Sequence, residues 1–165
     1  MAVGTLQSNA ISIRPSQHSG YSHRLMRGRE GSTQTFETGA VLIRSSGYLV
    51  EASADPVADI VGVAAGNATG TQGAECLYWP ATPDFVFEAT LEDETNENHA
   101  LVITNMFTDY ALQTDSSNNW YVDENDTTNT CVNIVGVKND SDITNATVRA
   151  RVLFVFLVDT TVYNT

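Results

Sequence analysis

The chain has 165 residues, of which 42% are hydrophobic and 17% are charged, and its formal net charge is −12. A chain of this length fits one domain with a core of its own, and its hydrophobic content is too high for a disordered protein. Nucleic acid and anionic membrane surfaces are disfavoured as partners of the acidic part, because phosphate groups repel a surface of the same charge.

Positive charge is concentrated near the N-terminus. Residues 1–44 have a net charge of +3, whereas residues 45–165 contain three basic and eighteen acidic residues, a net charge of −15. Residues 1–37 contain scattered glycines and no sustained hydrophobic period. This predicts an extended basic N-terminal arm, long enough to reach another subunit, ahead of a β-rich body domain over residues 38–165. The arm residues expected to contact a partner are Arg14, Tyr21, Arg24, Arg27 and Arg29.

From residue 38 onward the pattern is typical of strands. Residues 38–52 hold two β-prone runs joined by a short loop that ends in Gly47. This predicts a hairpin with the glycine in the left-handed region. Residues 59–65 and 74–79 are the next predicted strands, and Pro80 stops the second of them.

The middle of the chain continues the strand pattern. Apolar and polar side chains alternate in residues 84–91, which predicts a half-buried strand. Residues 100–105, 109–114 and 131–137 are further predicted strands, and Gly136 marks a bulge in the last of them.

Residues 148–158 form the last predicted strand. One face is apolar throughout, whereas the other begins with two arginines and ends with Leu153, Val155 and Leu157. A strand that is apolar on both faces has to be covered on both, either by a second sheet or by a neighbouring subunit. We take these three residues as the expected subunit interface. Because the chain shows no convincing helix, the predicted fold is all-β, a small β-sandwich or barrel with an extended N-terminal arm.

Recognisable catalytic motifs are lacking, since the sequence contains no GxSxG, no phosphate-binding glycine loop and no HExxH. His18, His23 and His99 lie in loop-like segments and make no ligand set. Glu92 and Glu94 could perform acid–base work, but within a run of acids a solvated loop is the expected structure. We therefore expect no enzymatic activity, no cofactor and no metal.

Two other features could be either functional or purely structural. Residues 123–127 present alternating oxygen ligands as a calcium loop does, but they lack the glycine and the terminal glutamate of an EF-hand, which favours a turn with Asx hydrogen bonds. Trp79, Trp120 and Tyr121 could stack on sugar rings, although anchoring in the core is the expected role.

The cysteines and the first residues bear on the cellular compartment. Cys76 and Cys131 belong to no CxxC motif or Cys/His cluster, and we expect buried, reduced thiols, with a disulfide between them left open. The first ten residues lack the charged and apolar regions of a signal peptide, so synthesis and folding in a cytoplasm are expected.

One ordered set of segments carries a family resemblance. The hairpin AVLIRSSGYLVEA is followed by DIVGVAAGNA, PDFVFEATL, NNWYVDENDTTNT and a final VRARVLFVF. Over roughly residues 38–158 this order resembles the small head-decoration, or cement, proteins of tailed bacteriophages. The resemblance implies an all-β body, often a trimer, bound outside an icosahedral head where major-capsid subunits meet. It implies no cofactor or enzymatic activity, and it transfers no site residues.

The resemblance and the charge pattern predict a structural virion protein. It would be assembled in the host cytoplasm, lie on the capsid exterior and clamp neighbouring major-capsid subunits through its basic arm. Because an exposed ion pair contributes about 0.2 to 1 kcal/mol, one arm is too weak, and a homotrimer presenting three arms is expected. The alternative is a viral surface module that recognises host glycans through Trp120 and Tyr121. An enzyme with perturbed carboxylates in a pocket is the third candidate.

Overall fold

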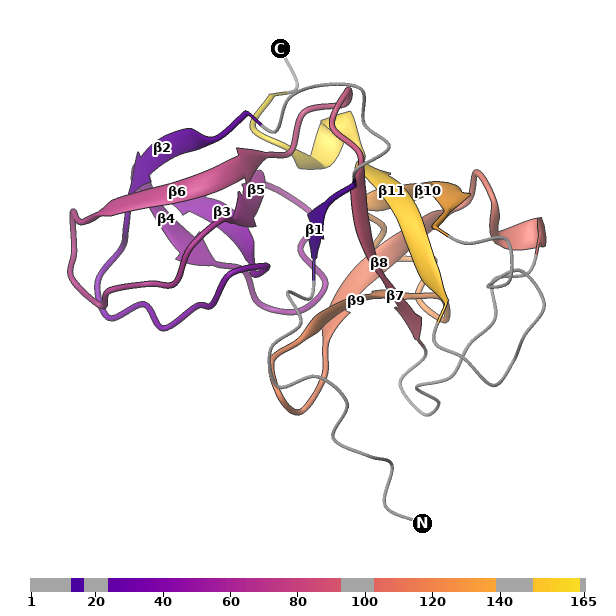
Figure 1. Ribbon diagram of the computed structural model, residues 1–165, viewed down its shortest axis with the longest axis horizontal. Helices are drawn as coiled ribbons and strands as arrows, with labels where there is room; N and C mark the ends of the chain where they lie inside the picture. Colours follow the sequence, from indigo (N-terminus) through magenta and orange to yellow (C-terminus); the bar gives the residue numbers. More distant parts are fainter. Residues whose placement is uncertain (1–12, 17–23, 93–102, 139–149, 164–165) are drawn as a thin grey trace.

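The computed structural model describes residues 13–16, 24–92, 103–138 and 150–163, which form strands, turns and two short 3-10 helices but no α-helix. Figure 1 shows two β-sheet units lying side by side. The predicted all-β fold is therefore confirmed. The elements are β1 (Arg14–Pro15), β2 (Met26–Arg29), β3 (Val41–Ser45), β4 (Tyr48–Glu51), β5 (Ile60–Ala64), β6 (Glu75–Pro80), β7 (Phe87–Glu92), η1 (Ile103–Asn105), β8 (Asp109–Thr114), β9 (Trp120–Asp123), β10 (Val132–Val137), β11 (Arg151–Phe156) and η3 (Val158–Thr160).

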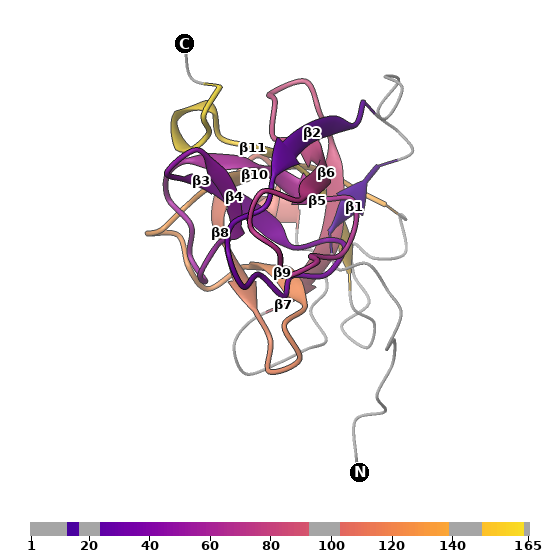
Figure 2. The same cartoon turned by 90° about the vertical axis from the view of Figure 1, so that its left-hand side faces the viewer.

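The first unit, called here the N-terminal sheet, is antiparallel and has the strand order β2-β6-β5-β3-β4. Its two edge strands approach each other, because Glu30 bridges Leu49 and the Gly31 amide donates to the Leu49 carbonyl at 2.8 Å. Figure 2, which views the molecule from this side, places β2 and β6 opposite β3 and β4. The sheet therefore curls back on itself.

The second unit, called here the C-terminal barrel, closes completely. Its strand order is β7-β11-β10-β8-β9, and a parallel pairing of Leu91 with Val122 joins β9 back to β7. The short strand β1 also pairs with β7, at Phe87 and Glu88, so β1 and β9 share one edge of β7. A barrel leaves no open sheet edge, which removes the usual site of unwanted strand pairing.

Aromatic side chains fill much of the core. Phe85, Phe87, Phe154 and Phe156 have neighbouring ring centroids 4.7 to 5.8 Å apart, in tilted, stacked and edge-on arrangements. Such pairs each contribute about 0.5 to 1.5 kcal/mol beyond the area they bury. The alternation predicted for the last strand is confirmed over β11, where Val152 and the two phenylalanines are buried.

The predicted hairpin and bulge are both confirmed. Strands β3 and β4 pair from Ser45 and Tyr48 outward, and the two loop residues, Ser46 and Gly47, have φ values of 50° and 85°. Positive φ at both positions defines a type I′ turn, whose twist matches that of the strands. The register of β10 against β11 shifts between Ile134 and Gly136, as a bulge requires.

Contacts between side chains and backbone join the two units. The indole N–H of Trp120 in β9 donates to a Glu51 carboxylate oxygen in β4 at 3.3 Å. The Asp55 amide donates to the Leu112 carbonyl at 3.0 Å, and the Val162 amide donates to the Ile60 carbonyl at the same distance. The last bond fastens the C-terminal segment to the N-terminal sheet.

Three local predictions differ from the structure. Within the predicted strand 100–105, the described residues 103–105 form η1, because the chain turns there and the Thr108 amide donates back to the Asn105 carbonyl at 3.4 Å. The polar segment around Trp120, for which the sequence predicts no strand, contains the strand β9, since pairing with both β8 and β7 outweighs its polar flanks. Val158, expected in the core, is 44% exposed because the chain leaves the strand for η3.

The predicted arm also differs from the structure in its described residues. Within residues 1–37, β1 pairs with β7 and β2 pairs with β6, so both pieces belong to the two units of the body. Ile13 and Phe36 are buried in the core. These strands form through partners far along the chain, which a local hydrophobic period does not reveal. Tyr21 lies outside the described residues.

Candidate functional site

The four arginines of the predicted arm lie in three different places, and Arg14 forms an ion pair within the barrel. Arg14 in β1 lies opposite Glu88 in β7, and its guanidinium forms an ion pair with the Glu88 carboxylate. Lys138 and Arg151 reach the same carboxylate oxygen at 3.0 and 3.5 Å. Arg14 therefore fastens β1 to the barrel.

Glu88 is a buried carboxylate surrounded by cations. Burial alone would raise the pKa of Glu88, but hydrogen bonds from Lys138 and Arg14, together with the charge of Arg151, outweigh burial and lower it. The group is thus ionised at neutral pH and paired with more than one positive charge. This arrangement is structural, since it explains how a two-residue strand stays on the sheet.

Arg27 and Arg29 lie on one face of β2 and are exposed to solvent. Arg27 pairs with Glu75 at 3.1 Å, with side chains 74% and 48% exposed, and Arg29 donates to the Gly73 carbonyl at 3.2 Å. Surface pairs of this kind are weak and exchange readily for other partners. Between them, Gly28 faces Leu49, and a Cβ at Gly28 would lie 2.4 Å from a Leu49 methyl carbon. Gly28 therefore lets β2 approach the Leu49 side chain closely.

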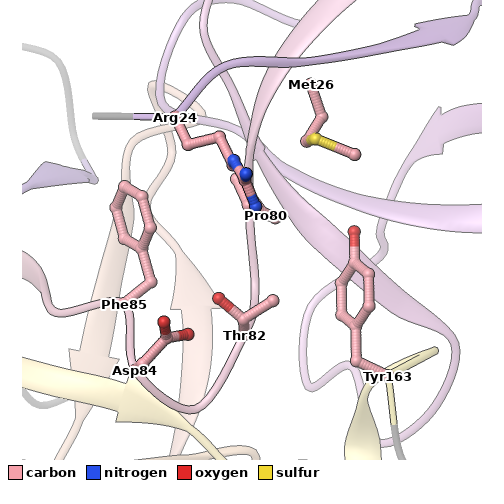
Figure 3. A pocket seen from close by; sticks show the side chains of 7 residues that line it. All are labelled: Arg24, Met26, Pro80, Thr82, Asp84, Phe85 and Tyr163. Carbon is pink, nitrogen blue, oxygen red and sulfur yellow. The ribbon is translucent and has the colours of Figure 1, made fainter. Parts of the chain in front are cut away.

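Arg24 lies apart from this pair, at a cleft of about 510 Å³. Figure 3 shows its guanidinium extending over Pro80 toward the space that Tyr163 and Met26 also face. The lining residues come from the N-terminal and C-terminal parts of the chain and from the segment that connects β6 to β7. The lining residues are Arg24, Met26, Pro80, Thr82, Asp84, Phe85 and Tyr163.

Pro80 explains why the cleft exists. The Ala81 amide donates to β5 and the Leu77 carbonyl accepts from the residue just after β5. The backbone groups of Tyr78 and Pro80 therefore point toward β2. The register that pairs Met26 with Tyr78 would place Arg24 opposite Pro80, which has no N–H to donate. The β2–β6 ladder therefore ends at Met26, and the strand pair opens into the cleft.

Tyr163 contributes a partly buried phenol to the cleft. Burial raises the pKa of Tyr163, and a hydrogen bond shared with the Tyr78 hydroxyl raises it further. The phenol is therefore neutral at physiological pH and offers a hydroxyl rather than a negative charge. The site combines one cation, one acid, two hydroxyl groups and an apolar wall.

The predicted subunit interface lies on the outer face of β11. Leu153, Val155 and Leu157 are partly exposed there, and Leu153 lies against Gly136 of the bulge. The barrel's own core covers the opposite face of this strand. A role for the three residues in self-association stays a prediction.

The predicted aromatic residues are anchored in the structure. Trp120 and Tyr121 are buried, and Trp79 is partly buried against the core. Core anchoring is therefore confirmed, and neither buried ring offers a flat face to a sugar. The expected turn is confirmed too, because the Asp123 carboxylate accepts from the Asn125 amide at 2.9 Å.

The remaining candidate groups are the cysteines, the acidic pair and the histidines. Cys76 and Cys131 are free and buried as predicted, and burial raises their pKa values to about 11 and about 12, so both stay protonated. Among the described residues, no group of three or more His, Cys, Asp or Glu side chains could hold a metal. Glu92 is buried in β7, whereas Glu94 and the three histidines, His18, His23 and His99, lie outside the described part.

Comparisons with known proteins give no relative from which a role could be transferred. No protein family, no curated protein and no solved structure matches this chain. Within the residues that the structure describes, no helix is long and apolar enough to cross a membrane.

The sequence predicts Arg24 as a contact of the basic arm, but it predicts neither the cleft nor the residues that line it with Arg24. Met26, Asp84 and Tyr163 come from three separate segments, and nothing local in the sequence connects them. The available signal was Pro80, which was interpreted as the end of one strand. Its missing donor also ends the neighbouring ladder.

Proposed function

We propose that this chain is a structural virion protein that decorates and stabilises an icosahedral phage capsid by clamping neighbouring major-capsid subunits. The observation that carries the proposal is the basic surface of β2 on a protein whose net charge is −12. Arg27 and Arg29 display exposed charge that an acidic capsid surface would attract. Arg14 is left out of the contact set because Glu88 already binds it.

Affinity requires several copies. Exposed ion pairs contribute about 0.2 to 1 kcal/mol each, so a few arginines alone give weak binding. A homotrimer that places three such surfaces on a repeating lattice gains avidity through effective concentration. The partly apolar outer face of β11, with Leu153, Val155 and Leu157, is the surface we assign to self-association.

Capsid binding is tested by mixing the purified chain with undecorated heads of the phage that encodes it and imaging the particles by electron microscopy. We expect density for the chain at fixed lattice positions. The double variant Arg27→Glu, Arg29→Glu should lose this density, whereas Arg44→Glu, a change at another exposed arginine on β3, should keep it. Heads that stay bare with the unmodified chain would refute the proposal.

Self-association is tested separately by sedimentation equilibrium. We expect a trimer for the unmodified chain and a monomer for Val155→Asp, because a charge on the outer face of β11 opposes burial of that face. Val57→Asp, a substitution at an exposed residue of the N-terminal sheet region, serves as the control. If the unmodified chain is monomeric at all concentrations, the trimer is excluded.

A further inference from the structure

The cleft beside β2 holds two charged groups without partners in the described structure. Arg24 and Asp84 are both exposed, and neither forms an ion pair or hydrogen bond with another described residue. Both contribute to the same lining, together with Met26, which is 38% exposed. A binding partner could supply an anion for the unpaired cation and cover the exposed apolar surface beside it.

We infer that this cleft binds an extended segment of the major capsid protein in which an apolar side chain stands next to an acidic residue. The inference rests on the proposed function, since it names the partner of that function. Arg24 would receive the carboxylate in a fork of two N–H donors. Met26, Pro80 and Phe85 would form the wall for the apolar side chain.

Two other residues of the cleft could bind the backbone of a peptide. The Thr82 hydroxyl and the Asp84 carboxylate are oxygen acceptors, and an extended peptide offers a backbone N–H at every residue. The cleft volume of about 510 Å³ lies within the range of about 300 to 1,000 Å³ common for ligand sites. This space is enough for one large side chain and its neighbour.

The charges in the cleft disfavour other kinds of ligand. A phosphate group is better held by several cations than by one, and Asp84 and the net charge of −12 both repel it. A purely apolar ligand would bury Arg24 and Asp84 without partners, which costs free energy. A segment with one carboxylate and free N–H donors satisfies both groups.

The inference is tested on the full chain with methyl-¹³C-labelled methionine and two short peptides. Acetyl-Gly-Phe-Asp-Gly-amide carries the carboxylate, and acetyl-Gly-Phe-Asn-Gly-amide has the same shape without the charge. We expect the first peptide to shift the Met26 methyl signal in the millimolar range, about tenfold more tightly than the second. Met106, which packs against the core of the barrel, serves as an internal reference.

Three variants sharpen this titration. Arg24→Gln should weaken binding of the aspartate peptide about tenfold, and Asp84→Asn should strengthen it because a repelling charge is lost. Arg44→Gln, which removes an exposed arginine from the opposite part of the sheet, should leave binding unchanged. Equal shifts of Met26 with both peptides, or no shift with either, would overturn the inference.

Head binding separates this inference from the proposed function. If undecorated heads bind the unmodified chain and Arg24→Gln equally well, the cleft is not the docking site although the protein still decorates the capsid. If the heads bind neither, while the aspartate peptide binds the cleft, the capsid protein is excluded as the partner. Loss of head binding in Arg24→Gln with the Arg44→Gln control intact supports the inference.

Discussion

In the C-terminal barrel, β7 pairs with β11 along one edge, and β1 and β9 share its other edge, whereas in the N-terminal sheet β2 meets β4 only near Glu30 and Leu49. The barrel has its edges paired and its core filled with phenylalanine. In the sheet, the β2–β6 ladder ends at the pair of Met26 with Tyr78, before Pro80, and the cleft opens at that point. Complete closure supplies rigidity, while incomplete closure leaves a surface that a partner can use.

The two units also hold their buried carboxylates differently. Glu88 in the barrel is surrounded by cations, chiefly Lys138 and Arg14. Glu30 next to the sheet accepts from neutral donors, with the Gly70 amide at 2.6 Å and the Thr69 amide at 2.8 Å. Ion pairs therefore hold β1 on the barrel, whereas hydrogen bonds from backbone amides hold the end of β2 on a loop.

Removing an aromatic ring from the barrel should produce the largest effect. Phe154 is fully buried between Phe87 and Phe156, so Phe154→Ala should lower the free energy of unfolding by about 3 to 5 kcal/mol through lost burial and a cavity. Met26→Ala at the open end of the sheet should change it by about 0.5 kcal/mol or less. Urea denaturation measures both. Similar losses in the two variants would contradict the proposed difference between the units.

The contribution of Glu88 to stability should depend on pH. Because the pKa of Glu88 is lowered in the folded state, its ionised form stabilises the protein above the ordinary value of 4.5, and this contribution is lost as pH falls below that value. Glu88→Gln should therefore cost about 1.5 to 3 kcal/mol at neutral pH and progressively less in acid. Urea denaturation at a series of pH values measures the difference.

Glu30→Gln provides the comparison for the salt dependence of stability. Added sodium chloride should reduce the cost of Glu88→Gln, because its cationic partners are partly exposed and therefore screened. The cost of Glu30→Gln should change little, because its donors are uncharged. An equal salt dependence for both variants would show that the cations around Glu88 do not stabilise β1.

The sequence predicted those parts of the fold whose signals are local. Alternation identified the buried face of β11, and a serine–glycine loop identified the hairpin turn at Gly47. The strand β9 was missed because its four residues gain their stability from pairing with two other strands. The arm was misjudged for the same reason, since Arg14 pairs with a residue 74 positions away.

The candidate site was predictable only in part. Arg24 was identified by the cluster of basic residues, but its place at a cleft depends on Pro80 and on the C-terminal segment that carries Tyr163. That segment reaches the cleft because Thr161 bridges Ile60 of β5. Contacts between chain segments this distant depend on tertiary packing, which composition and periodicity do not encode directly.

The smallest expected effect concerns backbone conformation in the two units. Around the N-terminal sheet, the non-glycine residues with positive φ have smaller side chains, as Thr33, Ser46 and Asp59 do, whereas the barrel places Phe107 at a φ of 59° with its side chain 74% exposed. A bulky residue in the left-handed region costs about 1 to 2 kcal/mol, and asparagine tolerates this region better. Both units therefore contain non-glycine residues in this region, and Phe107 is the bulkiest of them among the described residues.

Replacing this residue should stabilise the barrel. We expect Phe107→Asn to raise the free energy of unfolding by about 0.5 to 1 kcal/mol, because little buried surface is lost and the strain is relieved. Val57→Asn, at an exposed apolar residue without a positive φ, should stay within about 0.5 kcal/mol of the unmodified chain. Thermal and urea denaturation measure both changes. A loss of stability in Phe107→Asn would mean that the phenylalanine ring forms contacts which outweigh the strain at its own backbone.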